Sequence, residues 1–319
     1  MSAMSETTQQ ITGRFAPSPS GRMHLGNAFS SLVAWASARS TGGRMVLRIE
    51  DLDPRTKDPE LARQIIDDLA WLGLDWDEGP IRQSDRGEVY LEALERLKGL
   101  GLTYPCFCTR AELHAASAPH ASDGVYIYQG TCRGLSEEQI ARRLETRPAA
   151  TRLKVPEPAE ELGAIDFDDL GWGPQHEALA RDCGDFLVRL SDGVIAYQLA
   201  VVVDDCLMGV NQVVRGRDLL SSSARQIYIA HLLGFTPPTY GHVPLLVAPD
   251  GRRLAKRDRD CDLGALREAG ETPEKIIGRL AEPLGLAERG EPVSAQEFVE
   301  RFSWDAVRSH RDDIVIAGV

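Results

Sequence analysis

A short apolar segment, a Pro/Ser/Gly turn and a helical segment follow one another near the N-terminus, and this order constrains the fold more than any other feature. Residues 11–15 are predicted to form a strand, and a helix is expected from about 24 to 39. A buried strand follows at 45–49, and Asp58 and Pro59 then start the next helix as N-cap and first helical residue. Strands and helices in this order predict an α/β fold with a parallel sheet.

The later part of the chain has a different pattern. Residues 104–190 contain Pro-rich breaks and no clear strand–helix–strand rhythm, so we interpret them as an insertion. The alternation is expected to resume with residues 193–205, followed by a helix near 222–233 and an apolar strand over 243–247. From about residue 263 onwards the chain is predicted to be helical to its end.

The first predicted helix begins with His24, Gly26 and Asn27, a pattern that suits a nucleotide ligand. A helix N-terminus after a tight turn presents unpaired N–H groups and a positive dipole to a triphosphate. Gly26 would let adenine or ribose approach closely, and His24 could donate to a phosphate oxygen as charge builds in an adenylyl-transfer transition state. Taken alone, a helix-capping histidine explains this motif at least as well.

Further charged segments could serve ligands at the same site. Glu50 follows the second predicted strand, and the carboxyl ends of parallel strands face the ligand crevice of an open sheet. Glu50 could therefore accept from an α-ammonium group, while Arg14 could grip a carboxylate bidentately. The alternative is a surface salt-bridge cluster with no ligand. The basic segment 251–257 is expected to act as a mobile cationic clamp on ATP phosphates, with a basic surface loop as the alternative.

Composition limits the class of protein. The chain has 36 basic and 48 acidic residues and a net charge of −12, which argues against a sequence-independent nucleic-acid coat but leaves room for one structured RNA bound by a local patch. The arginine-rich stretch 133–154 is a candidate patch for RNA binding, and a solvated helix face is its alternative.

No apolar run is long enough to span a bilayer, and residues 1–10 lack a signal pattern, so we expect a cytoplasmic protein with no membrane partner.

Three of the six cysteines, Cys106, Cys108 and Cys132, gather in one part of the chain. In a reducing compartment such a cluster is better explained by a metal site than by a disulfide. A tetrahedral zinc needs a fourth ligand, and spacing alone nominates His114 or His120. Buried free thiols explain the spacing equally well.

The residues around these motifs resemble those of glutamyl-tRNA synthetases, a class I family. Residues 14–26 are similar to the segment that carries the HIGH motif of that family, and residues 48–51 match its Arg-Ile-Glu-Asp segment. Residues 214–220 resemble the second half of the same catalytic domain, and residues 251–257 stand where the KMSKS loop belongs. The resemblance covers about residues 11–260 and implies the Rossmann-like parallel sheet of a class I synthetase.

The resemblance also implies roles for individual residues. Tyr197 and Arg215 would complete a glutamate pocket, with Arg215 as the partner of the side-chain carboxylate. Lys256 matches the second lysine of the basic loop and would contact the ATP phosphates, which carry Mg²⁺, while Arg253 replaces the first lysine and Ala255 the serine. The expected residues are, for catalysis, His24 and Lys256; for glutamate, Arg14, Phe15, Ala16, Pro17, Ser18, Glu50, Tyr197 and Arg215; and for ATP, His24, Gly26, Asn27, Arg253 and Lys256.

For the cysteines, the resemblance implies a metal. Short glutamyl-tRNA synthetase-like proteins carry a Cys-x-Cys…Tyr-x-x-x-Cys zinc site in the insertion, and residues 128–132 match its second part. One structural zinc per chain is therefore expected on Cys106, Cys108, Tyr128 and Cys132, with His114 as the runner-up for Tyr128.

The same resemblance divides the chain into four segments. We expect the first half of a nucleotide-binding catalytic domain in residues 1–105, a zinc-containing insertion in 106–190, the second half with the basic clamp loop in 191–262, and a helical tail in 263–319.

Departures from the tRNA-charging enzymes narrow the resemblance. Leu219 stands where those enzymes usually have His. Only about sixty residues follow the basic loop, whereas the tRNA-charging enzymes continue there into a helical anticodon-binding domain. With the Tyr/Cys zinc pattern, these features resemble glutamyl-queuosine tRNA(Asp) synthetases. The resemblance implies that glutamate is activated with ATP without tRNA and is then transferred to the queuosine at the wobble position of tRNA(Asp). Tail helices or residues 133–154 would hold the anticodon stem-loop, and a monomer is expected.

Two alternatives stay open. A truncated glutamyl-tRNA synthetase would charge the 3′ end of a tRNA instead. A non-enzymatic zinc- and RNA-binding module would perform no chemistry. Arg14, His24, Glu50 and Lys256 argue against the module, because a binding protein does not need an ATP clamp.

Overall fold

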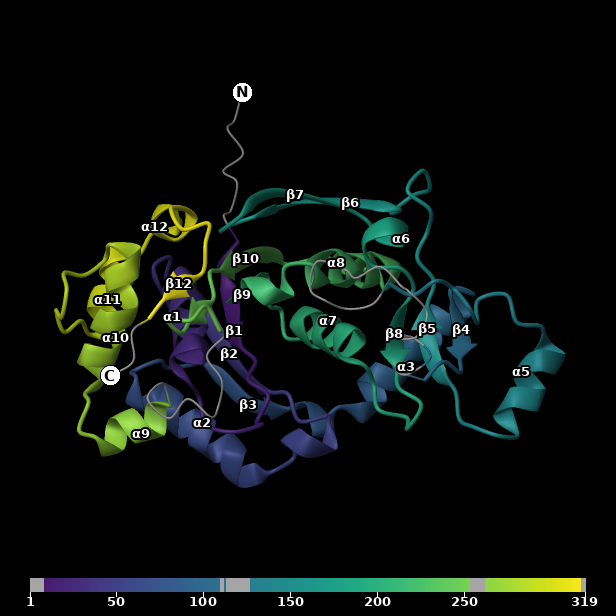
Figure 1. The fold of residues 1–319 in the computed structure, drawn as a ribbon, viewed down its shortest axis with the longest axis horizontal. Helices are drawn as coiled ribbons and strands as arrows, with labels where there is room; N and C mark the ends of the chain where they lie inside the picture. The colour runs from purple at the N-terminus through teal and green to yellow at the C-terminus, as the bar shows by residue number, and fades with distance from the viewer. Residues whose placement is uncertain (1–8, 110–111, 113–126, 253–261, 317–319) are drawn as a thin grey trace.

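The computed structural model describes residues 9–109, 112, 127–252 and 262–316. Figure 1 shows three parts along the long axis of the molecule. The C-terminal helices lie at one end, the central parallel strands lie in the middle, and the antiparallel strands of the insertion lie at the other end.

The central parallel strands are organised in two groups. They are β1 (Thr12–Phe15), β2 (Arg44–Ile49), β3 (Glu78–Arg82), β9 (Gln212–Gly216) and β10 (Thr239–Val243). The first three pair in the order β1-β2-β3, and β9 pairs with β10. Asn211 joins the groups, because its backbone N–H donates to the carbonyl of Thr12 at 3.0 Å and its Oδ1 accepts from the Thr12 N–H at 2.8 Å. The predicted parallel α/β architecture is confirmed.

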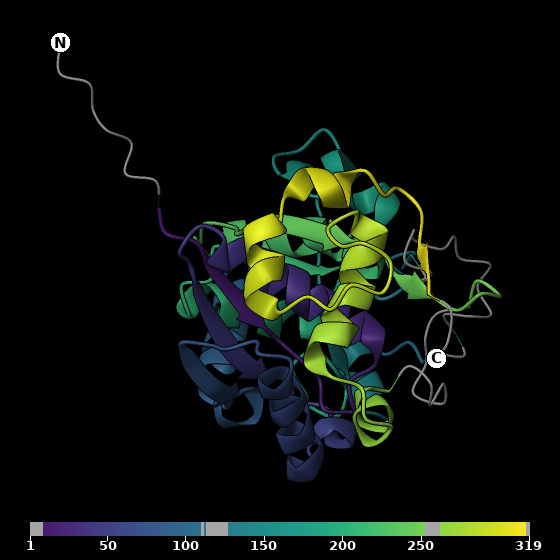
Figure 2. The ribbon, with the colours of Figure 1, turned by 90° about the vertical axis from the view of Figure 1, so that its left-hand side faces the viewer.

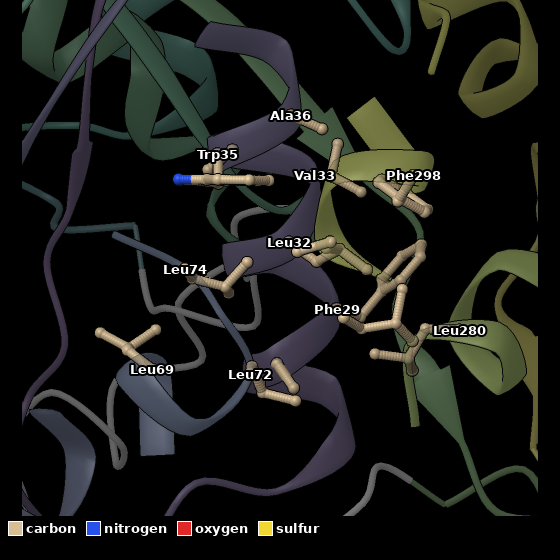
Figure 3. Close-up of a cluster of buried hydrophobic side chains, with 14 of the residues drawn as sticks. Phe29, Leu32, Val33, Trp35, Ala36, Leu69, Leu72, Leu74, Leu280 and Phe298 are labelled. Atoms are coloured by element: carbon tan, nitrogen blue, oxygen red, sulfur yellow. The ribbon is translucent and has the colours of Figure 1, made fainter. Parts of the chain in front are cut away.

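Helix α1 (Leu25–Arg39) crosses over from β1 to β2 and forms the centre of the larger apolar core. Its side chains Phe29 and Leu32 lie close to Leu280 and Phe298 of the C-terminal helices (Figure 3). Complete burial of each such large apolar side chain contributes roughly 1.5–3 kcal/mol. The start of the next helix, α2 (Pro59–Trp71), is as predicted, because the Asp58 side chain accepts from the Glu60 N–H at 2.9 Å.

The C-terminal segment covers the outer side of α1. Figure 2, in which the left-hand side of Figure 1 faces the viewer, shows these yellow-green helices in front of the purple α1. The prediction of helix to the end of the chain is wrong for one short piece, because β12 pairs in parallel with β11. The elements are α9 (Leu263–Glu268), α10 (Pro273–Ala281), α11 (Ala295–Arg301), α12 (Trp304–Arg308), β11 (Leu246–Val247) and β12 (Ile314–Val315).

The insertion is built around antiparallel strands. The sheet has the order β4-β5-β8, and a separate hairpin pairs β6 with β7. Helix α3 packs beside the three-stranded sheet and ends shortly before β4 begins. The elements are α3 (Gly87–Gly99), β4 (Thr103–Cys106), α5 (Glu137–Leu144), β5 (Ala150–Leu153), β6 (Ala164–Asp169), β7 (Gly173–Ala178), α6 (Leu179–Asp182) and β8 (Phe186–Arg189).

One expectation for the second half of the fold is wrong. Most of residues 193–205, where the alternation was expected to resume before a helix, belongs to helix α7 (Tyr197–Leu207). All of Leu199 to Asp205 is buried in this helix. A helix buried on every side has no polar face, so its sequence shows a continuous apolar run that cannot be distinguished from a buried strand. The helix expected near 222–233 is present as α8 (Ser222–Leu232).

Candidate active site

A cavity of about 680 Å³ opens where β1, β2, β9 and β10 end. This is the edge at which open α/β sheets bind their ligands. Every described residue that we predicted for glutamate or ATP lines it. These residues are Arg14, Phe15, Ala16, Pro17, Ser18, His24, Gly26, Asn27, Glu50, Tyr197 and Arg215. Arg253 and Lys256 of the basic loop lie outside the described residues.

His24 occupies the N-cap position of α1. Its Nδ1 accepts from the Gly26 N–H at 3.1 Å, and its backbone N–H donates to Oδ1 of Asn27 at 3.2 Å, so the two residues form a reciprocal capping box. Because Nδ1 accepts, the proton of the neutral ring is on Nε2, which is then a hydrogen-bond donor. The capping alternative is therefore realised in the structure, and it is compatible with the phosphate-donor role.

Gly26 is needed for a reason that the sequence did not reveal. A Cβ at this position would lie 2.9 Å from Cε1 and 3.0 Å from Nδ1 of His24, which is closer than side chains tolerate. The glycine lets the His24 ring fold over the first turn of α1. Close approach of adenine or ribose to Gly26 stays a prediction.

Arg215, at the end of β9, is a buried cation in the cavity wall. All five of its N–H groups donate to acceptors in the described part of the chain, and none of these acceptors is a carboxylate. They are His242 Nε2 at 3.0 Å, Gln226 Oε1 at 2.8 Å, Ser223 Oγ at 3.0 Å, the Leu219 carbonyl at 3.1 Å and the Tyr197 hydroxyl at 3.4 Å. Burying a cation among neutral partners is costly, and an anionic ligand offsets that cost.

Tyr197 has the longest of these hydrogen bonds and lies at the mouth of the site. It is the first residue of α7, is 38% exposed and lines the cavity. A ligand carboxylate could replace its hydroxyl on Arg215 and accept the phenolic proton. The two residues thus form one polar corner of the cavity.

Arg14 and Glu50 belong to a buried network of charges below the cavity. Arg48 is at its centre, 2.6 Å from Oδ1 of Asp205, 3.1 Å from Oε1 of Glu50 and 3.6 Å from Oδ2 of Asp204. Although burial disfavours its charge, these carboxylates raise the pKa of Arg48 above its ordinary value. Arg14 lies at the edge of the network, with its Nε 3.8 Å from Oδ1 of Asp205.

Arg14 and Glu50 each remain incompletely neutralised. Nη1 of Arg14 donates to the Val214 carbonyl at 2.8 Å, but its buried Nε has no hydrogen-bond acceptor among the described residues. Burial lowers the pKa of Arg14 and raises the pKa of Glu50. Both shifts mean that the charged forms of these side chains are poorly solvated, so oppositely charged ligand groups would stabilise them.

Sequence reasoning did not identify Arg48, Asp204 or Asp205. A usable signal existed, because each of these charged residues directly adjoins or interrupts a run of apolar residues. His242 was also not identified. It stands in β10 among residues of ordinary strand character, and nothing near it in the sequence points to Arg215.

The three clustered cysteines come together as expected, and Tyr128 joins them. The Sγ atoms of Cys106, Cys108 and Cys132 all lie within 4.8 Å of one another. The separations are 3.6 Å between Sγ of Cys108 and Cys132, and 3.7 Å and 3.6 Å from the Tyr128 hydroxyl to Sγ of Cys106 and Cys108. A tetrahedron with ~2.3 Å zinc–sulfur bonds has edges of ~3.8 Å, so the donor set fits this metal. His114 and His120 lie outside the described residues.

The surroundings of this cluster act on the charge of its thiols. Burial raises the pKa of Cys108 to about 11, whereas hydrogen bonds from the Phe107 N–H and from neighbouring side chains outweigh burial and lower the pKa of Cys132. Nε of Arg152 donates to Sγ of Cys106 at 3.2 Å, and its guanidinium lies 3.7 Å from the centre of the Tyr128 ring. Arg152 would partly balance the negative charge of three thiolates.

The arginine-rich stretch 133–154 is mostly engaged in structural contacts. Arg152 is buried at the cysteine cluster, and the guanidinium of Arg143 lies 5.8 Å from the centre of the Phe107 ring. Arg133 donates to the Val155 carbonyl at 3.2 Å. Arg152 therefore cannot belong to a surface that contacts RNA, and an RNA role for the rest of this stretch stays a prediction.

None of the helices in the described ranges is long and apolar enough to cross a membrane.

Residues 10–315 match a family described as the catalytic domain of class I tRNA synthetases for E and Q. The chain is 49% identical over 318 residues to the glutamyl-Q tRNA(Asp) synthetase of Symbiobacterium thermophilum, which covers 96% of both sequences. It is 50% identical over 287 residues to the glutamyl-Q tRNA(Asp) synthetase of Nitratidesulfovibrio vulgaris, which covers 86% of this chain and 87% of that relative.

Solved structures with a similar fold include a glutamate tRNA ligase of Elizabethkingia meningosepticum in complex with its amino acid. The TM-score is 0.79 at 27% sequence identity, and the match covers 97% of this chain and 68% of that chain. A glutamate-tRNA synthetase of Elizabethkingia anophelis matches with a TM-score of 0.80, the same identity and the same coverage.

Proposed function

The chain belongs to the glutamyl-Q tRNA(Asp) synthetases, ligases of the class I synthetase family for glutamate and glutamine, and we propose that it activates glutamate with ATP and transfers it to queuosine in tRNA(Asp). The observation that carries the proposal is the buried Arg215, whose hydrogen-bond partners in the described structure are all neutral. A cation of this kind selects a side-chain carboxylate over a carboxamide, because only the carboxylate supplies the missing negative charge.

Glutamate would bind through its three charged groups. Its side-chain carboxylate would meet Arg215 and the hydroxyl of Tyr197. Glu50, whose charge is poorly solvated, would accept hydrogen bonds from the α-ammonium group, and Arg14 would contact the carboxylate that reacts. These contacts leave the α-carboxylate facing the His24 side of the cavity.

The first chemical step is an in-line displacement at phosphorus. An oxygen of the glutamate α-carboxylate attacks the α-phosphorus of ATP, the bond to the β-phosphate oxygen breaks, and glutamyl-adenylate and pyrophosphate form. His24 would donate from Nε2 to a phosphate oxygen as negative charge develops, and the N-terminus of α1 adds its dipole. No side chain acts as a nucleophile, so catalysis consists of positioning and charge stabilisation.

The basic loop would supply the second set of phosphate contacts through Arg253 and Lys256. Asp262, the first described residue after the loop, forms a β-bridge with His24, and the Leu263 N–H donates to the Met23 carbonyl at 2.9 Å. The chain therefore leaves the loop directly beside the N-terminus of α1, which supports a role for the loop at the same triphosphate.

In the second step a hydroxyl of queuosine would attack the activated carbonyl and release AMP. An acidic protein with local basic patches is suited to a hairpin loop, and RNA is generally read through splayed single-stranded bases. The truncated-synthetase alternative is favoured by one observation, the similarity to solved structures of a glutamate tRNA ligase and a glutamate-tRNA synthetase. In that case the acceptor would be a tRNA 3′ end.

We further propose one structural zinc per chain on Cys106, Cys108, Tyr128 and Cys132. Four protein donors would fill a tetrahedral shell and leave no position for water or substrate, so the metal would hold the insertion together and take no part in the reaction.

Glutamate-dependent exchange of pyrophosphate into ATP tests the activation step. We expect pyrophosphate exchange with glutamate in the absence of tRNA and no exchange with glutamine. Exchange with glutamate should not depend on added tRNA. An absolute requirement for tRNA would favour the truncated-synthetase alternative instead.

A further inference from the structure

Behind Arg215 lies a second buried pair, His242 and Asp169. Nε of Arg215 donates to Nε2 of His242 at 3.0 Å, and Nδ1 of His242 lies 2.6 Å from Oδ2 of Asp169. The side chains of His242 and Asp169 are both 0% exposed. The three residues come from β9, β10 and the end of β6, so the insertion hairpin reaches the wall of the active site through this chain of hydrogen bonds.

The chain of hydrogen bonds fixes the tautomer of the His242 ring. A guanidinium can only donate, so Nε2 must accept and the single proton of the neutral ring must be on Nδ1, where it is donated to Asp169. Burial lowers the pKa of His242 to about 4, which keeps the ring neutral near pH 7. In the opposite tautomer, an N–H of the ring would face an N–H of Arg215.

Asp169 is itself held in place. Its Oδ1 accepts from the backbone N–H groups of Gly171 and Trp172, each at 2.9 Å, and from that of His242 at 3.1 Å. Gly171 allows this turn, because a Cβ there would collide with the His242 carbonyl oxygen. The carboxylate therefore presents one oxygen to the backbone and the other to the ring.

We propose that Asp169 and His242 are positioning residues that orient Arg215 for the substrate carboxylate while leaving its charge uncompensated. This inference rests on the proposed role of Arg215 in glutamate binding. A carboxylate in direct contact would neutralise the guanidinium and compete with the substrate. The neutral imidazole instead accepts one N–H, fixes the plane of the guanidinium, and keeps the negative charge of Asp169 one ring away.

Asp169→Asn tests this role with almost no change in shape. The amide oxygen can still accept from the three backbone N–H groups, but the amide nitrogen would face Nδ1 of His242 and donate to it. The ring must then carry its proton on Nε2, directed at Arg215. We expect the KM for glutamate in pyrophosphate exchange to rise on the order of 10- to 100-fold, with the KM for ATP and the melting temperature close to wild type.

The same hairpin supplies a matched control. Oδ1 of Asp166, in β6, lies 2.7 Å from Nδ1 of His176, but both side chains are exposed and neither lines the cavity. Asp166→Asn makes the identical chemical change in the same hairpin, and it should leave the KM for glutamate unchanged.

Two further measurements separate positioning from general structural support. The ¹⁵N chemical shifts of the His242 ring should report a proton on Nδ1 in the wild type and on Nε2 in Asp169→Asn. In a His242→Ala background, which has no ring to carry the change from residue 169 to Arg215, Asp169→Asn should raise the KM for glutamate no further.

The inference is overturned if Asp169→Asn keeps the wild-type KM for glutamate, or if the KM values for glutamate and ATP rise together with a lower melting temperature. It is also overturned if the wild-type ring carries its proton on Nε2. Failure of the proposed function would look different, because the wild type would then show no glutamate-dependent exchange at all, whereas the ring shifts would still report the tautomer.

Discussion

The ring of His24 covers Gly26 so closely that a Cβ on the glycine would lie 2.9 Å from Cε1 of the histidine. The hydrogen bond from the Gly26 N–H to Nδ1 keeps the ring in this place and leaves the proton on Nε2. Helix capping and phosphate binding are thus two functions of one side chain.

Gly26→Ala should lower the rate of pyrophosphate exchange without lowering the stability of the fold. The added Cβ must displace the His24 ring and so removes its capping hydrogen bond. Alanine is favoured over glycine in a helix by roughly 0.5–1 kcal/mol, which offsets this loss, so stability should stay close to that of the wild type. We expect the kcat of pyrophosphate exchange to drop about 10-fold or more, as is typical for a lost transition-state donor. Gly99→Ala in α3 is the control, because a Cβ there meets nothing within 4 Å and activity should be unchanged.

Arg215→Lys should weaken glutamate activation while conserving charge. A lysine cannot reproduce the five hydrogen bonds of the guanidinium or bind a carboxylate bidentately, so kcat/KM for glutamate should fall on the order of 100-fold. The neighbouring change Arg217→Lys is the control, since Arg217 pairs with Asp313 at 2.6 Å and does not line the cavity. Near-normal glutamate kinetics in Arg215→Lys would show that the carboxylate binds elsewhere.

Metal analysis of the purified protein should give one zinc per chain. Cys106→Ser should lower the zinc content and the melting temperature together, because it removes a thiolate from a closed donor set. Cys206→Ser, at a half-buried thiol of α7 outside the cluster, should retain the metal. A zinc-free wild type with the same melting temperature as Cys106→Ser would instead support buried free thiols.

Stability should depend on pH through His242. Burial lowers its pKa to about 4 from an ordinary 6.5, so between these values the unfolded chain binds a proton that the folded chain does not. The stability contributed by the neutral ring is complete above pH 6.5 and is lost as the pH falls through 4. From pH 7 to pH 4.5 the unfolding free energy should drop by about 2–3 kcal/mol more in the wild type than in His242→Gln, as measured by urea titration. Equal drops would mean that the ring is not buried in its neutral form.

The parallel sheet could be predicted from local patterns, whereas most residues of the cavity wall were predicted from the resemblance of their motifs to those of a synthetase family. Arg14 lies near the end of β1, Glu50 follows β2 and His24 caps the start of α1, and these positions place all three at one edge of the sheet. Cys106, Cys108 and Cys132 were candidates because they gather in one part of the chain, and Tyr128 was added by the resemblance to short glutamyl-tRNA synthetase-like proteins.

What could not be predicted depends on contacts between distant parts of the chain. Asp169 and His242 are 73 positions apart and act on a third residue, so no local pattern marks them. Helix α7 was misread because burial on every side removes the polar face from which a helix is recognised. Burial of Arg152 beside Cys106 likewise follows from strand pairing, and it removed one arginine from the predicted RNA surface.

The position of the transferred glutamate tests the central claim most directly. Labelled glutamate, ATP and the protein are incubated with a synthetic anticodon stem-loop of tRNA(Asp) that carries queuosine, with the same loop carrying guanosine, and with full-length tRNA(Asp). We predict label on the queuosine loop, none on the guanosine loop, and label on full-length tRNA(Asp) that nuclease mapping assigns to the wobble position. Label on the 3′-terminal adenosine, with none on the queuosine loop, would contradict this account.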